Sequence, residues 1–329
     1  MKLITLDDGS RDGQLAVVSR DLASAHFAAG IAGRMQQLLD DWNFISPQLE
    51  DLYAALNDGK ARHAFAFDPA RCRAPLPRAY QWLSVADGSG AGAGALSWVR
   101  HPGDDLPGPR QRLPAAGTAG TAGTDGADGG DGIEGVTVGL GIAAVTSDVA
   151  RRATTEAGLD AVRLLLLFSE AEGLDARATA FAPVAVTPDE LGTAWRGGRV
   201  ALDAAARIGR RRLAARPPAD TPPPHLGELI AAAATSHRLG AGSVVGCALR
   251  RWDPAHTGTE SAPGRKLQPG DTLQIDMADA DVAPLFGTIE WHWQRSTAMA
   301  ADVGDTLINA PISDADPDPD PDAATAAVS

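Results

Sequence analysis

The sequence predicts a β-rich α+β protein with a small N-terminal α+β domain. Short alternating apolar runs occur along most of the chain, while few segments show helical spacing. The composition also changes after a proline-rich segment at residues 74–77, which is typical of a domain boundary. With 329 residues, 44% of them hydrophobic, the chain can bury a substantial core.

Residues 1–73 are expected to form the small domain. The apolar runs 3–6 and 14–18 alternate and are separated by turn residues, so they predict a hairpin. Apolar residues then recur at helical spacing over residues 31–58. A hairpin followed by helix is a small α+β unit.

Residues 74–312 are expected to form the larger, β-rich domain. Strand-like runs lie at 136–138, 142–146, 273–277 and 286–289, and a buried strand is expected to begin within 164–168. Helical spacing covers 154–166 and 225–238. Gly, Ala and Thr dominate residues 88–132, which predicts a flexible loop, and the Asp-Pro repeat in residues 313–329 predicts a disordered acidic tail.

The net charge limits the partners that we expect, and the cysteine content indicates the cellular compartment. Acidic residues outnumber basic ones by 42 to 29, for a net charge of -13, which excludes nucleic acid and anionic lipid as expected partners. No apolar run approaches the roughly 18 residues of a membrane span. Cys72 and Cys247 are far apart, and Asp7 precedes any apolar leader segment. We therefore expect a cytoplasmic protein with reduced thiols.

Three segments carry a family resemblance. They are APLPRAYQW at 74–82, FAPVAVTPDELG at 181–192 and LGAGSVVG at 239–246. In this order they resemble the bacterial fumarylacetoacetate hydrolase family, and the resemblance extends over most of residues 1–294. It implies a mixed β roll for the larger domain and a dimeric protein.

The resemblance also implies a metal site. In that family an Asp, an E-x-E pair on a strand and a further Asp hold Mg²⁺ or Mn²⁺, since hard cations require oxygen ligands. The ion polarises a dicarbonyl substrate. Asp87 matches the first ligand, and Glu170, with Glu172 as a substitute, matches the last. The E-x-E pair falls on Gly139 and Gly141, which offer no ligand atom.

The other catalytic positions of the family are changed as well. Its general base falls on Gly94 or Ala95, and His101 lies nearby but displaced. Its lysine falls near Ala176 and Arg177, and an arginine is a poor substitute for the point charge of a lysine. Losing the base alone typically costs about 10²- to 10⁴-fold in rate. The sequence thus assigns no catalytic residue and at most weak Mg²⁺ or Mn²⁺ binding, by Asp87 and Glu170.

These changes predict a catalytically impaired family member, which acts as a non-catalytic subunit or a small-molecule binder. It is expected to form a homodimer, or a heterodimer with an intact family member. The alternative is a metal-dependent hydrolase. It would cleave a C–C bond in fumarylacetoacetate- or acylpyruvate-type 1,3-dicarbonyl compounds of aromatic amino-acid catabolism. A decayed gene product is a further possibility that one sequence leaves open.

Overall fold

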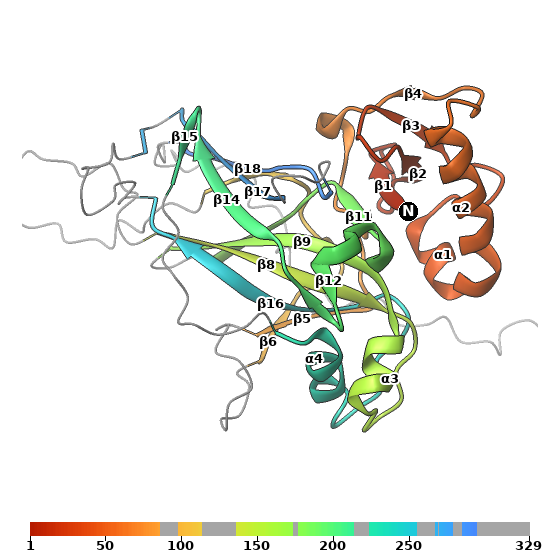
Figure 1. The fold of residues 1–329 in the computed structure, drawn as a ribbon. Helices are drawn as coiled ribbons and strands as arrows, with labels where there is room; N and C mark the ends of the chain where they lie inside the picture. Colours follow the sequence, from red (N-terminus) through yellow and green to blue (C-terminus); the bar gives the residue numbers. More distant parts are fainter. Residues whose placement is uncertain are drawn as a thin grey trace, which may run out of the picture. The chain divides into compact units, whose positions relative to one another are not determined.

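One large, mixed β-sheet organises the protein (Figure 1). The computed structural model describes residues 1–85, 98–113, 136–173, 177–213, 224–254, 267–268, 270–278 and 285–294. All of them belong to one compact unit, Met1–Arg295.

The strands of the large sheet come from segments far apart in the sequence, from Lys2 to Trp252. Its order is β4 (Phe65–Ala66), β3 (Ser24–Phe27), β2 (Gln14–Val18), β1 (Lys2–Leu6), β11 (Val184–Val186), β9 (Val162–Glu172), β8 (Thr137–Thr146), β16 (Ser243–Trp252), β5 (Gln81–Val85) and β6 (Trp98–His101), and β10 (Arg177–Phe181) also pairs with β9. Neighbours are antiparallel, apart from the parallel pair β5 and β16. Long strands β8, β9 and β16 therefore lie in the interior of the sheet.

The N-terminal hairpin predicted from residues 3–6 and 14–18 is confirmed. Strands β1 and β2 pair antiparallel, and β1 also pairs with β11, where Leu3 lies opposite Ala185. Helices α1 (Met35–Asp40) and α2 (Trp42–Asn57) occupy the segment with helical spacing. Strands on both sides of the predicted boundary at residue 73 thus share one sheet.

Smaller elements surround this sheet. A 5-stranded sheet has the order β15 (Arg211–Arg212), β14 (Asp203–Ile208), β17 (Thr272–Ala278), β18 (Ile289–His292) and β7 (Arg110–Arg112), and β12 (Trp195–Arg196) pairs with β13 (Arg199–Val200). The remaining helices are α3 (Thr155–Asp160), α4 (Leu226–Ala233) and the 3₁₀ turns η1 (Pro69–Arg71) and η2 (Pro188–Ala194). Among the described residues, no helix is both long and apolar enough to span a bilayer.

Buried apolar side chains fall into two clusters that follow the alternation along β8. Leu140 and Ile142 belong to a cluster that includes Trp291 of the 5-stranded sheet. Ala143 belongs to the other cluster, with Leu38 of α1. Both faces of the central strands are therefore buried, which explains their nearly continuous apolar sequence.

Some predicted elements differ in extent. The helix predicted over 154–166 is wrong beyond Asp160, because the chain enters β9 at Val162, where residues 164–167 are buried on both faces of the sheet. Helix α4 ends earlier than the predicted 225–238. The runs 136–138 and 142–146 are parts of the single strand β8. Strands β6 and β7 lie within the predicted loop 88–132, of which the structure describes residues 98–113. The rest of that segment and the tail 313–329 lie outside the described residues.

Candidate functional site

Apart from Asp87, the residues matched to the predicted metal site lie on β8 and β9, which are paired neighbours. Gly139 lies opposite Glu170, and Gly141 lies opposite Phe168. Because side chains alternate along a strand, Phe168, Glu170 and Glu172 project from the same face of β9. On the same face of β8, Gly139 and Gly141 carry no side chains. The side chains of β9 and of β16 can therefore approach one another across this part of β8.

The two glycines differ in the space around them. A Cβ atom at Gly141 would lie 2.3 Å from Cζ of Phe168 and 2.5 Å from the carbonyl oxygen of Cys247. At Gly139 the nearest heavy atom to such a Cβ is the carbonyl oxygen of Arg250, at 3.6 Å. The Phe168 ring therefore fills the space that a side chain at position 141 needs, whereas position 139 has room for one.

Glu170 lies in a buried polar cluster with Ser84 and His101. Ser84 Oγ donates to Oε1 of Glu170 at 3.3 Å and lies 2.7 Å from Nε2 of His101. The distance from Nε2 of His101 to Oε1 of Glu170 is 3.4 Å. One arrangement satisfies all three groups: His101 Nε2–H donates to Ser84, whose own hydrogen goes to Glu170.

Aromatic packing holds His101 in this position. His101 lies opposite Trp82 in the β5–β6 pair, and the two rings stack with centroids 4.9 Å apart. The Trp82 ring also meets Phe168 edge-on at 5.0 Å. Side chains of β5 and β9 can meet across the sheet because Gly246 lies between them, where a Cβ would be 2.9 Å from Phe168 and 3.0 Å from Trp82.

Burial favours the neutral forms of both titratable groups. It raises the pKa of the Glu170 carboxyl above its usual value. Burial, together with the nearby positive charge of Arg177, lowers the pKa of His101 to about 4. The cluster is therefore best described as a neutral imidazole beside a carboxyl group with a raised pKa, rather than as an ion pair.

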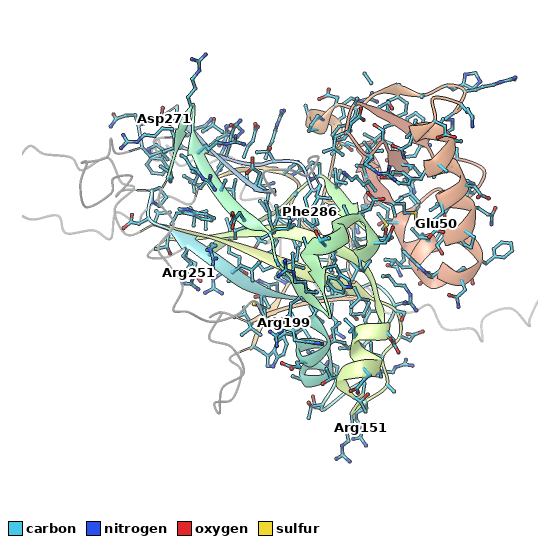
Figure 2. The ribbon with its side chains drawn as sticks, viewed as in Figure 1. Glu50, Arg151, Arg199, Arg251, Asp271 and Phe286 are labelled. Atoms are coloured by element: carbon cyan, nitrogen blue, oxygen red, sulfur yellow. The ribbon has the colours of Figure 1, made fainter. Side chains whose placement is uncertain are left out.

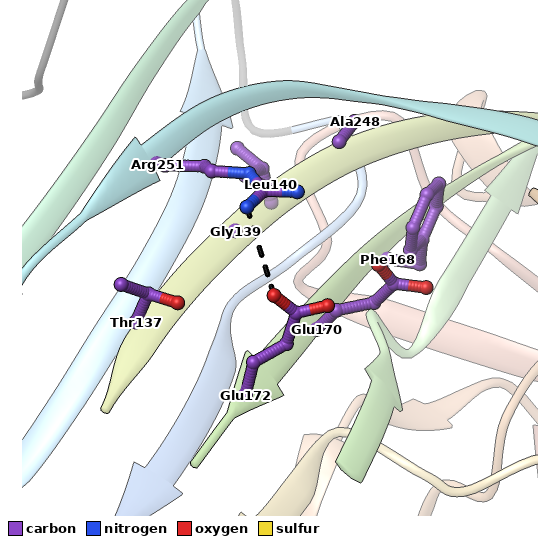
Figure 3. A pocket seen from close by; sticks show the side chains of 8 residues that line it. All are labelled: Thr137, Gly139, Leu140, Phe168, Glu170, Glu172, Ala248 and Arg251. Atoms are coloured by element: carbon purple, nitrogen blue, oxygen red, sulfur yellow. Dashed lines mark ion pairs between the residues drawn. The ribbon is translucent and has the colours of Figure 1, made fainter. Parts of the chain in front are cut away.

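Two arginines meet the neighbouring carboxylate at the edge of this site. Arg177 of β10 forms an ion pair with Glu172, and Nη1 of Arg251 on β16 lies 3.6 Å from the same carboxylate. Figure 3 shows Arg251 reaching past Gly139 towards Glu172, and Figure 2 shows its place on the fold. Arg177, Arg251 and Glu172 are 41%, 39% and 28% exposed, so solvent reaches this group.

A small cavity lies beside Glu170 of the buried cluster and Arg251. Its lining includes Thr137, Phe168, Glu170, Glu172 and Arg251. The space available to the centre of a water-sized molecule is about 10 Å³. This volume is about that needed by one water molecule, so an organic ligand does not fit without movement of a side chain.

The described residues do not fit a divalent metal ion. No group of three or more His, Cys, Asp or Glu side chains that could hold a metal occurs among them. A hard cation such as Mg²⁺ takes several oxygen ligands, whereas Glu170 is hydrogen-bonded to Ser84 and Glu172 is paired with arginine. Metal binding by Glu170 together with Asp87 stays a prediction, since Asp87 lies outside the described parts of the chain.

The structure brings together residues that the sequence left apart. His101, displaced from the family base position, contacts Glu170, and Ser84 joins them although no motif marked it. Arg177 contacts Glu172 rather than Glu170. The positions Gly94, Ala95 and Ala176 lie outside the described residues.

A family model matches the N-terminal part of the chain. The model describes the fumarylacetoacetase N-terminal domain 2, and it matches residues 1–78. No curated protein matches the sequence.

Solved structures of low sequence identity share the fold. Maleylpyruvate hydrolase from Sphingobium sp. SYK-6 is 16% identical with a TM-score of 0.59, and the similarity covers 89% of this chain and 99% of that one. Fumarylacetoacetate hydrolase from Exiguobacterium antarcticum is 16% identical with a TM-score of 0.58, with the same shares covered. A putative HpcE protein from Mycobacterium smegmatis is 17% identical with a TM-score of 0.57, covering 89% of this chain and 100% of that one.

These similarities agree with the resemblance seen in the sequence motifs and confirm the β-rich α+β fold. Residues 1–78 thus match the fumarylacetoacetase N-terminal domain 2, and the chain shares its fold with the maleylpyruvate hydrolase and the fumarylacetoacetate hydrolase named above.

Proposed function

We propose that this protein lacks the metal-dependent hydrolysis of the family and acts as a non-catalytic member, either binding a small molecule or serving as a subunit. The packing at Gly141 carries this proposal. The Phe168 ring and the carbonyl oxygen of Cys247 occupy the space that a side chain at position 141 would need. The pair of positions that would supply strand carboxylates therefore has no ligand atoms, and one of the two has no room for any.

The expected loss of function is large. With two carboxylates missing, a Mg²⁺ ion bound here would keep mostly water as its ligands, which lowers both its affinity and its rigidity. The absence of a base at the family position typically costs a further factor of about 10² to 10⁴ in rate. Both effects act on the same reaction, so residual hydrolysis by this route is expected to be very slow.

Calorimetric titration of the full chain with Mn²⁺ and Mg²⁺ tests this proposal. We expect no binding at micromolar concentrations for the natural sequence, and the same result for the Asp87→Ala and Glu170→Gln variants. The Sphingobium maleylpyruvate hydrolase, whose structure was solved in complex with manganese(II) and pyruvate, is the positive control. Micromolar binding that Asp87→Ala abolishes would overturn the proposal.

A second candidate is a hydrolase of 1,3-dicarbonyl compounds of the acylpyruvate type. The presence of a neutral imidazole favours it, because His101, whose Nε2 lies 3.4 Å from Glu170, has a second ring nitrogen that can accept a proton, as a base weakened by its lowered pKa. Turnover of an acylpyruvate that depends on Mn²⁺ and is lost in His101→Gln would support this candidate. No turnover above the rate in buffer, with or without Mn²⁺, would exclude it.

We also propose that the protein assembles as a homodimer or with an intact family member. A non-catalytic subunit predicts that an intact paralogue is encoded nearby. Light scattering of the purified chain, alone and co-expressed with such a paralogue, measures the mass of the assembly. A monomer under both conditions would contradict the subunit role.

A further inference from the structure

Two guanidinium groups from different strands surround the carboxylate of Glu172. Arg177 approaches it from β10, and Arg251 approaches it from β16 at 3.6 Å. Glu172 is the last residue of β9 and is 28% exposed, so its side chain can rotate into solvent. The protein thus contains a carboxylate held between two arginines, and this carboxylate lines a small cavity. Figure 3 shows Glu172 with one of the two, Arg251.

The glycine at position 139 allows this arrangement. Gly139 lies between Arg251 on β16 and Glu170 on β9 in the sheet. A Cβ at Gly139 would lie 3.8 Å from Cγ of Arg251, so the arginine side chain runs along the bare backbone of β8. A longer side chain at position 139 would obstruct the path of Arg251 towards Glu172.

The cavity beside Glu172 is lined by groups that match a small organic acid, but it has room for one only if Glu172 moves. Phe168, Leu140 and Ala248 contribute apolar surface to its lining, and Thr137 contributes a hydroxyl group. The free space is only about 10 Å³ for the centre of a water-sized molecule. A ligand can therefore enter only in place of the Glu172 side chain.

We propose that Arg177 and Arg251 form a binding site for the carboxylate of a small organic acid, which Glu172 occupies in the ligand-free protein as an internal competitor. A planar guanidinium recognises a carboxylate through paired N–H donors, and Glu172 shows that a carboxylate fits between these two arginines. This inference deepens the small-molecule role of the proposed function and requires no metal ion.

Titration of the full chain with malonate and propionate, in buffer that contains EDTA, tests the site. Replacing Glu172 by Gln removes the competing charge. One partly exposed ion pair changes an equilibrium constant by up to about fivefold, so malonate should bind Glu172→Gln up to about 5-fold more tightly than the natural chain. Arg177→Gln and Arg251→Gln should each weaken malonate binding in the Glu172→Gln background.

Matched controls separate this site from general attraction of anions. Arg250 precedes Arg251 on β16, and its Nη1 donates to the carbonyl oxygen of Leu249, so Arg250→Gln should leave malonate binding unchanged. Propionamide, which has the shape of propionate without its charge, should not bind.

Several results would overturn the proposal. They are equal malonate affinity in the natural and Glu172→Gln chains, equal loss in Arg250→Gln and Arg251→Gln, or equal affinity for malonate and inorganic phosphate. Glu172→Asp, which shortens the competitor by one methylene, should give an intermediate affinity and serves if Glu172→Gln does not fold. Because EDTA removes divalent ions, failure here leaves the metal titration of the proposed function unaffected.

Discussion

At the scale of single residues, the Ser84–His101–Glu170 cluster shows how burial determines chemistry. His101 and Glu170 are almost fully covered, and burial shifts the pKa of each towards the neutral form, upward for Glu170 and downward for His101. Ser84 bridges them, so their polar atoms are satisfied without an ionised pair. The cluster is consequently a structural network that can also accept a proton.

His101 should make stability depend on pH. Its pKa is about 4 in the folded protein and about 6.5 when unfolded, so the unfolded chain takes up the proton first as the pH falls. The stability associated with neutral His101 is therefore fully present above pH 6.5 and is lost progressively as the pH falls towards 4. The loss is up to about 3 kcal/mol in the free energy of unfolding.

Urea unfolding between pH 4 and 7 measures this effect. His101→Gln, which can still donate to Ser84, should show a shallower loss of stability over this window than the natural chain. Glu170 acts in the opposite sense, because a raised folded pKa stabilises at low pH and the gain disappears as the pH rises. Identical pH profiles for the two proteins would contradict the assignment of His101.

The glycines of β8 provide a matched pair of substitutions. Gly141→Ala places a methyl group against Phe168 and the backbone of β16, so it should destabilise the fold by about 1–3 kcal/mol. Gly139→Ala meets only ordinary contacts and should be nearly neutral. Thermal denaturation of both variants checks this, and equal effects would show that Phe168 does not fill the site as described.

At the scale of elements, one buried hydrogen-bonded chain joins the two sheets beside the site. Trp291 Nε1 on β18 donates to Ser169 Oγ on β9 at 2.9 Å, and Ser169 donates to the carbonyl oxygen of Gly139 on β8 at 2.6 Å. Ser169 and Trp291 are fully buried, so a lost partner is not replaced readily by water. The 5-stranded sheet thereby helps to fix the backbone at Gly139.

Ser169→Ala should therefore cost about 1–3 kcal/mol, because it leaves the Trp291 indole N–H without its acceptor. Trp291→Phe removes the donor and should be costly through lost packing as well. The double variant should lose less stability than the sum of the two single losses, by at least about 0.5 kcal/mol. Additive free energies in a urea-unfolding cycle would show that the hydrogen bond contributes nothing.

The sequence predicted the elements whose signals are local. The β1–β2 hairpin and the helices near α1 and α2 followed from alternation and helical spacing. Strand β8 was predicted as two runs because Gly139 and Gly141 interrupt its apolar pattern. Pairing with β9 and β16 on both sides holds the glycine backbone extended, and this is a tertiary effect.

The candidate site was predicted only in part for a similar reason. The family match located Glu170, but the contact with His101 depends on the register between β5 and β6. That register cannot be counted across a long Gly-rich segment. Arg251 carried no signal at all, since it meets Glu172 only through the arrangement of three neighbouring strands.

At the scale of the whole molecule, the large sheet connects the N-terminal strands to the site. Strand β1 pairs with β11, and β11 pairs with β9, which carries Glu170. Leu3 of β1 and Phe168 of β9 belong to the same buried cluster. Part of the hydrophobic core of the small domain predicted for residues 1–73 is therefore shared with the larger, β-rich part of the chain.

This continuity predicts a single cooperative unfolding transition. Leu3→Ala creates a cavity in the shared cluster and should lower the stability of the whole described unit by about 2–5 kcal/mol. Phe44→Ala, at a site that is 74% exposed, should have little effect. Far-UV circular dichroism and tryptophan fluorescence should report the same midpoint in each protein, and two separate midpoints would indicate independent domains.

The tight contact at Gly141 also makes it difficult for single mutations to introduce a carboxylate at this position. A mutation to Glu at position 141 alone would collide with both the Phe168 ring and the backbone of Cys247 before it could offer an oxygen to a metal ion. Shrinking Phe168 first would leave a hole in the aromatic cluster around Trp82. Each single step is therefore expected to destabilise the fold, so the present packing disfavours an acidic side chain at this position.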